Sequence, residues 1–159
     1  MPISISARRR QFLDEKGIKY VTVSHSPAYT SQEVAASLHV PGRELAKSVV
    51  VNADGGFALG VLPAPRRIDL GQLKKAVGAR ELRIATEAEF QSLFPDCETG
   101  AMPPFGNLYG LPVWADESLK EDAEIVFNAG SHTDTVKMSY KDFERLVAPT
   151  VAKFAERSA

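Results

Sequence analysis

Two apolar strands joined by a tight turn, residues 48–62, constrain the fold more than any other part of the chain. The first run, Ser48–Asn52, leads into Asp54-Gly55-Gly56, and the second, Phe57–Leu62, ends before Pro63. Asp-Gly and Gly-Gly pairs are typical of two-residue hairpin turns, and β-branched runs of this length favour strands. The segment therefore predicts a β-hairpin, whose turn fixes the register of the two strands.

Helix and strand signals surround this hairpin without a strict βαβ repeat. Capping residues predict helices after Ser6, Thr30, Asp69, Thr86 and Ser139. The helix after Ser6 should reach Lys16, the one after Thr30 Leu38, the one after Asp69 Gly78, and the one after Thr86 Phe94. The helix after Ser139 should run toward Phe154, with a break at Pro149. Strands are expected at 18–23, 112–115, 124–128 and 133–138, and a short helical turn should lead through Ala46 and Lys47 into the strand at Ser48. The expected fold class is mixed α/β: one compact domain over residues 1–159, with a mixed, mostly antiparallel curved sheet surrounded by helices.

The composition is that of an ordinary globular domain. Of the 159 residues, 44% are apolar and 25% are charged, which is enough to bury a core. The apolar runs are far shorter than the ~20 residues that cross a bilayer, and the N-terminus lacks the regions of a signal peptide. We therefore expect a soluble cytoplasmic protein with no membrane association. The single cysteine, Cys97, excludes an internal disulfide and a cysteine-cluster metal site.

The charges are segregated along the chain, although the net charge is only −1. Residues 41–83 contain eight basic and four acidic side chains, whereas residues 84–124 contain nine acidic side chains and only Lys120 as a base. Such segregation can give a basic face that meets a polyanion such as RNA. The alternative is an ordinary solvated surface, because mixed charges on exposed helices are common.

A stiff loop is expected at Gly100-Ala-Met-Pro-Pro-Phe-Gly106. Two prolines flanked by glycines form neither a helix nor a central strand. Proline fixes the backbone, and glycine lets another group approach it closely, so the loop suits binding by main-chain atoms. The alternative is a rigid surface connection between two strands.

Lys47 and His132 are the single residues most suggestive of a site. An ammonium at the rim of a sheet is a good phosphate ligand, although a lysine there can instead protect a strand edge from aggregation. His132 precedes a strand and could donate to a substrate or transfer a proton, although a lone histidine is more often a structural hydrogen-bonding group. The histidines and Cys97 share no metal-ligand spacing, so we expect no metal site.

The common hydrolase motifs are absent from the sequence. There is no Gly-x-Ser-x-Gly, Walker, Gly-x-Gly-x-x-Gly or His-Glu-x-x-His pattern. Cys97 lies between Asp96 and Glu98, whose charges oppose a thiolate. Any hydrolysis would therefore use a positioned water and main-chain donors, each oxyanion donor contributing ~3 kcal/mol.

Five short motifs, taken together, resemble those of a known family. They are His25-Ser-Pro-Ala-Tyr-Thr30, Leu45-Ala-Lys47 before Val49-Val-Val51, Val61-Leu-Pro63, Gly100-Ala-Met-Pro-Pro104 and Asn128-Ala-Gly-Ser-His132. In order and spacing over about residues 5–148, they resemble the YbaK family of prolyl-tRNA-synthetase-associated editing domains. The resemblance implies a YbaK-like fold and a free-standing aminoacyl-tRNA deacylase that acts in trans.

The resemblance also implies roles for individual residues. Lys47 would contact the phosphate or ribose of the terminal adenosine, and the loop from Gly100 would shape the amino-acid pocket and place the attacking water. By the same resemblance the catalytic residues are Lys47, Gly100 and His132, and the substrate-binding residues are Tyr29, Thr30, Ala101, Met102, Pro103, Pro104, Phe105 and Gly130. Members that process cysteine often carry Gly-Gly where this chain has Gly100-Ala101. No cofactor is implied, and the expected partner is the CCA end of an aminoacyl-tRNA, with a synthetase or an elongation factor as a further candidate partner.

The leading hypothesis is hydrolysis of a small mischarged residue such as alanine, serine or cysteine from tRNA. An aminoacyl ester needs no covalent nucleophile when water is placed and the oxyanion is met by donors, and the neighbouring ribose hydroxyl can assist. Pocket size would then select the amino acid, because each methylene contributes only ~1–3 kcal/mol of selectivity. The alternatives are a module that binds a tRNA end or an aminoacyl-nucleotide without turnover, and an interaction domain that has lost the chemistry.

Overall fold

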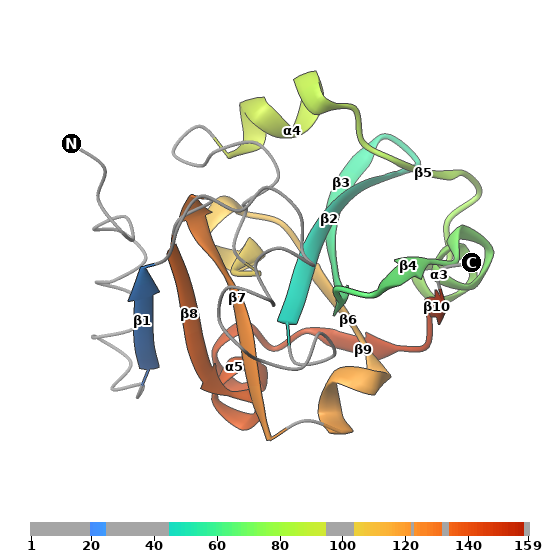
Figure 1. Ribbon diagram of the computed structural model, residues 1–159. Coiled ribbons are helices and arrows are strands. Elements are labelled where there is room, and N and C mark those ends of the chain that lie inside the picture. Colours follow the sequence, from blue (N-terminus) through green and yellow to red (C-terminus); the bar gives the residue numbers. More distant parts are fainter. Residues whose placement is uncertain (1–19, 25–44, 95–103, 122, 132–133, 158–159) are drawn as a thin grey trace.

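The computed structural model describes residues 20–24, 45–94, 104–121, 123–131 and 134–157 (Figure 1). The helices expected at 6–16 and 31–38 lie outside these ranges. In the described residues, eight strands form one sheet in the order β1-β8-β7-β2-β3-β6-β9, with β5 paired to β2. The strands are β1 (Tyr20–Ser24), β2 (Leu45–Ala53), β3 (Gly56–Pro63), β5 (Leu82–Ile84), β6 (Val113–Asp116), β7 (Glu124–Ser131), β8 (Asp134–Ser139) and β9 (Thr150–Ala152).

The sheet is mixed, as expected from the sequence. The pairs β1–β8, β7–β8, β2–β3 and β2–β5 are antiparallel, whereas β2–β7, β3–β6 and β6–β9 are parallel. A second, two-stranded sheet joins β4 (Arg66–Ile68) to β10 (Ala155–Arg157). The helices are α3 (Leu70–Val77), α4 (Glu87–Leu93) and α5 (Tyr140–Val147), and two 3₁₀ turns cover Gly106–Tyr109 and Glu117–Glu121.

The hairpin predicted from the sequence connects β2 and β3. Asp54 and Gly55 have φ angles of 52° and 90°, which the Asp-Gly pair tolerates. Asn52 Oδ1 accepts the Gly55 N–H at 2.8 Å and closes the turn. The Asp54 carboxylate accepts the N–H groups of Arg80 and Glu81, so the turn also holds the chain that enters β5.

The predicted caps of the three helices are confirmed. Asp69 accepts the Gln72 N–H at 3.1 Å, and α3 ends at Gly78 with φ 78°. Thr86 and Glu89 form the capping box of α4, and Ser139 accepts the Asp142 N–H at 3.1 Å to begin α5. Side-chain caps supply partners for N–H groups that have none inside a helix, so these starts could be read locally.

Two expectations from the sequence are wrong. Ala46 and Lys47 do not form a helical turn, because β2 already begins at Leu45 and pairs Ala46 with Phe127 and Pro63. The last helix does not continue toward Phe154. It ends at Val147, and the chain past Pro149 forms β9, parallel to β6, and then β10.

The sheet has a core on each face. Ala46 and Val50 belong to the larger cluster, which contains Phe143 of α5, whereas Val51 belongs to a second cluster with Leu73 of α3. This alternation follows from the strand period of two. In Figure 1, α3 lies to the right of the sheet beside β4 and β10, and α5 lies toward the bottom near β7 and β8. In the described part of the chain, no helix is both long and apolar enough to span a membrane.

Candidate active site

Lys47 is a half-buried cation on a strand inside the sheet. It is the third residue of β2, opposite Leu62 of β3. β2 lies between β3 and β7 in the sheet, although its pairing with β7 covers only Leu45 and Ala46. Desolvation by burial lowers the pKa of Lys47. Its side chain takes part in none of the ion pairs or hydrogen bonds found among the described residues, so no carboxylate of those residues pairs with its ammonium group.

The register of β2 and β7 brings a second motif beside Lys47. The parallel pairing covers Leu45 with Val126 and Ala46 with Phe127, and Lys47 and Asn128 are the residues that follow the last pair. Beyond this point the pairing of β7 with β8 shifts between Asn128 and Ser131, an irregularity that contains Gly130. Bulged backbone next to a strand end is often found at functional sites. Lys47 and Gly130, far apart in the sequence, therefore lie on neighbouring strands.

The sequence alone does not predict that Lys47 and the motif Asn128-Ala-Gly-Ser-His132 lie on neighbouring strands. Their proximity depends on the parallel pairing of β2 with β7, which no local pattern encodes.

The end of the proline-rich loop is anchored in the larger core. Pro104 is buried, and Phe105 is 0% exposed with its ring 5.2 Å from that of Phe127 in an edge-to-face contact. A Cβ at Gly106 would lie 2.6 Å from Val113 Cγ2, so only glycine fits there. Phe105 thus supports the loop from the core, and it rests on the residue that pairs with Ala46, next to Lys47.

The remaining site residues predicted from the sequence lie outside the described residues. These are Tyr29, Thr30, Gly100, Ala101, Met102, Pro103 and His132. Among the residues that are described, no three His, Cys, Asp or Glu side chains form a group that could hold a metal ion.

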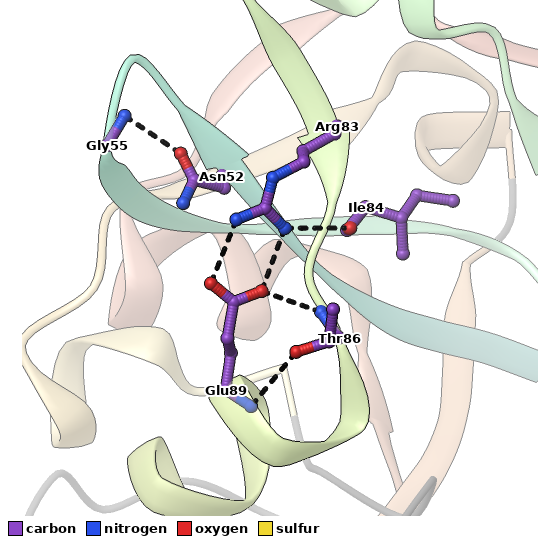
Figure 2. Close-up of polar contacts among 6 residues, drawn as sticks. All are labelled: Asn52, Gly55, Arg83, Ile84, Thr86 and Glu89. Carbon is purple, nitrogen blue, oxygen red and sulfur yellow. Dashed lines mark hydrogen bonds and ion pairs between the residues drawn. The ribbon is translucent and has the colours of Figure 1, made fainter.

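A hollow of about 330 Å³ lies at the other end of β2, lined by Asn52, Asp54, Gly55, Glu81, Leu82 and Arg83. Figure 2 shows protein partners for two of its polar side chains: Asn52 accepts the Gly55 N–H, and the Arg83 guanidinium binds both Glu89 carboxylate oxygens, at 2.8 and 2.9 Å. Hydrogen bonding to Arg83, followed by the bond from the Thr86 N–H, lowers the pKa of Glu89 to about 2. This network joins β5 to α4, and we regard it as structural.

Comparison with known proteins identifies the family. The sequence model described as the aminoacyl-tRNA editing domain matches residues 25–146. The chain belongs to this family. The resemblance inferred from the five sequence motifs is therefore confirmed.

Relatives of this editing domain cover nearly its whole length. The multifunctional Ser/Thr-tRNA deacylase ProXp-y of Escherichia coli K12 is 29% identical over 147 residues, which are 89% of this chain and 87% of that protein. The prolyl-tRNA editing protein ProX of Acetoanaerobium sticklandii is 28% identical, with 85% of each chain covered. A proline–tRNA ligase of Halalkalibacterium halodurans is 32% identical over 107 residues, 67% of this chain but 18% of the ligase. The names of the first two are those of editing enzymes, the class expected from the sequence.

Solved structures agree on the fold. A crystal structure described as a candidate trans-editing enzyme for prolyl tRNA synthetase has a TM-score of 0.82 at 28% identity, covering 96% of this editing domain and 99% of that chain. The hypothetical protein APE2540 has a TM-score of 0.86 at 21% identity, covering 94% and 99% of the two chains. The mixed α/β editing-domain fold expected from the sequence is thereby confirmed.

Proposed function

We propose that this protein is a trans-editing deacylase that hydrolyses the ester between a small amino acid and the 3′ end of a mischarged tRNA. In this proposal, residues 1–159 form one editing domain. The protein acts in the cytoplasm, where aminoacyl-tRNA is made and used. Its support is the family membership, together with relatives named as a Ser/Thr-tRNA deacylase and a prolyl-tRNA editing protein.

The observation that carries the proposal is the half-buried ammonium of Lys47, which has no ion-pair partner in the part of the chain that the structure describes. A cation that has lost part of its hydration interacts more strongly with an incoming anion than an exposed one does. A phosphate or ribose oxygen of the terminal adenosine supplies such a partner. Lys47 then holds the RNA end while the loop from Gly100 holds the amino acid.

The reaction needs only water and positioned dipoles. Water adds to the ester carbonyl carbon, the developing oxyanion is met by main-chain N–H groups of the loop at Gly100, and the bond to the ribose oxygen then breaks. The water proton ends on that ribose oxygen, with the neighbouring ribose hydroxyl or His132 assigned to its transfer. The products are a free amino acid and an intact tRNA.

The substrate assigned to this pocket is alanine, serine or cysteine on tRNA. Pro103 and Pro104 stiffen the loop, and a stiff wall excludes larger side chains better than it discriminates among small ones. Pro104 and Phe105, at the end of this loop, are buried, and their packing holds that end of the loop in place.

The test is deacylation of a panel of radiolabelled aminoacyl-tRNAs by the wild-type protein, Lys47→Met and Lys141→Met. A charge-assisted hydrogen bond contributes ~1.5–3 kcal/mol, so Lys47→Met should lower kcat/KM about 10–150-fold. Its melting temperature should not fall, because the ammonium it removes is half-buried and unpaired. Lys141, exposed on α5, controls for the loss of one positive charge.

Full activity in Lys47→Met would refute the assignment of Lys47. Wild-type protein that binds the charged tRNA yet leaves the ester half-life unchanged would instead support the alternative, a module that binds the tRNA end without hydrolysis.

A further inference from the structure

Five positively charged side chains on and around α3 have no ion-pair or hydrogen-bond partner among the residues that the structure describes. They form what we call the α3 cation face: Arg66, Lys74, Lys75, Arg80 and Lys153. All are exposed except Arg66, which is half-buried.

Three other cations in the described part of the chain have carboxylate partners, although Lys141 of α5, like the five, has none there. Lys120, Lys137 and Arg145 lie 4.0, 3.5 and 3.1 Å from carboxylate oxygens of Glu144, Glu124 and Asp142. Charges on those surfaces are therefore largely matched within the protein, whereas charges on the α3 cation face are not.

The carboxylates near the face are mostly engaged already. Asp54 and Asp69 accept backbone N–H groups, and Glu156 pairs with Arg67 at 2.7 Å. Of the acidic residues that neighbour the face, Glu81 alone has an exposed carboxylate without such a contact in the described structure. Asp54, Asp69 and Glu81 keep their negative charges, and Asp54 interacts electrostatically with Lys74. The five cations still outnumber these three carboxylates, so the surface carries an excess of positive charge that favours an external polyanion.

The face lies on the same side of the sheet as Lys47. Within β2, the residues that share the side of Lys47 include Val49 and Val51, which pack in the cluster that holds Leu73 of α3. From Lys47 to Ala53, where the hairpin turns toward Arg80, the strand rises about 20 Å. That distance corresponds to about six phosphate intervals along a duplex at ~3.4 Å each.

We propose that the α3 cation face binds the backbone phosphates of a tRNA acceptor stem whose 3′ end lies at Lys47. The position of that end rests on the proposed function, whereas binding of RNA to the face does not. Lysine and arginine on an exposed helix contact phosphates without reading base sequence. A protein partner would be expected to use apolar and aromatic anchors. The only large apolar side chains exposed in the described residues are Leu70 and Ile84.

The experiment measures binding of a fluorescein-labelled RNA minihelix that carries no amino acid. The minihelix consists of a tRNA acceptor stem and its CCA end, and binding is followed by fluorescence polarisation from 50 to 200 mM salt. The test variant is Lys74→Gln/Lys75→Gln/Arg80→Gln. The control, Lys120→Gln/Lys137→Gln/Lys141→Gln, removes the same charge elsewhere on the protein. Thermal melting verifies that both variants are folded, since all six side chains lie at or near the surface.

Three lost phosphate contacts reduce the slope of log K against log salt by about 2.7. Over this fourfold range, wild-type affinity should therefore fall about 40-fold more than that of the test variant, and the control should keep the wild-type slope. Equal slopes and affinities in the wild type and the test variant would overturn the proposal, and so would an equal loss in both triple variants. Because this RNA carries no amino acid, neither result bears on whether the wild-type protein hydrolyses aminoacyl-tRNA. Failure of this proposal is therefore distinguishable from failure of the proposed function.

Discussion

Replacing Asp116 by alanine should destabilise the fold at the connection between β9 and β10. Asp116, at the end of β6, is 1% exposed. Its Oδ1 accepts the N–H groups of Phe154 and Ala155, both at 2.8 Å, and its Oδ2 accepts the N–H and the hydroxyl of Ser118. One carboxylate therefore holds the connection between β9 and β10.

The magnitude follows from the groups that would lose their acceptor. Phe154 is 0% exposed and Ala155 7%, so Asp116→Ala leaves two buried backbone N–H groups unpaired. Each unpaired buried donor costs ~1–3 kcal/mol, which predicts a total loss of about 2–6 kcal/mol. The free energy of unfolding of a domain is ~5–15 kcal/mol, so the loss should be plain in a urea titration.

Two further variants sharpen the test. Asp116→Asn keeps an oxygen for Phe154 and Ala155, so it should lose less stability than Asp116→Ala. Glu117→Gln, an exposed neighbour with the same change of charge, should stay within ~0.5 kcal/mol of the wild type. An Asp116→Ala protein as stable as Glu117→Gln would refute the reasoning.

The pH dependence gives an independent readout. Burial raises the pKa of Asp116, but the four hydrogen bonds together outweigh it and hold the pKa below its ordinary value. A carboxyl with a lower pKa in the folded state stabilises the fold above its unfolded pKa of ~3.9 and loses that effect as the pH falls through the folded value. The wild type should therefore lose more stability than Asp116→Asn as the pH falls below about 4.

Two other positions give direct tests. Gly106→Ala should lower stability by ~1–3 kcal/mol, because its Cβ would lie 2.6 Å from Val113 Cγ2 and 3.0 Å from the Leu111 carbonyl oxygen. A thermal melt beside Gly56→Ala checks this, because Gly56 is exposed and its Cβ would lie at an ordinary 3.6 Å from the Ala53 carbonyl oxygen. The Glu89 carboxyl, whose pKa is about 2, should titrate closer to ~4.3 in Arg83→Gln when followed by NMR, and an unchanged midpoint would contradict the role of the ion pair shown in Figure 2.

The parts of the fold that the sequence predicted correctly are those governed by neighbouring residues. Asp54-Gly55 encodes its own turn, and Asp69, Thr86 and Ser139 each accept an N–H three residues ahead. Such signals need no knowledge of the rest of the molecule, because both partners lie within one turn of the chain.

The errors fall where distant segments decide the conformation. Thr150–Ala152 was expected to continue a helix past Pro149, yet it pairs with Trp114–Asp116, and the Asp116 carboxylate binds the backbone that follows. Pro149 and the β-branched Thr150 and Val151 were local hints of a strand, but the pairing partner lies over thirty residues away. Tertiary pairing outweighed helix propensity here.

The candidate site depends both on local sequence motifs and on pairing between distant segments. The motifs near Lys47 and Asn128 could be recognised one by one, but only the parallel pairing of Ala46 with Phe127 makes them neighbours. The same Phe127 supports the proline-rich loop through Phe105. A change at Phe127 would thus disturb the alignment of β2 with β7 and the base of the loop together. The positions of β2, β7 and the end of the proline-rich loop relative to one another therefore depend on one packed core residue, and the spacing of the motifs in the sequence does not reveal this dependence.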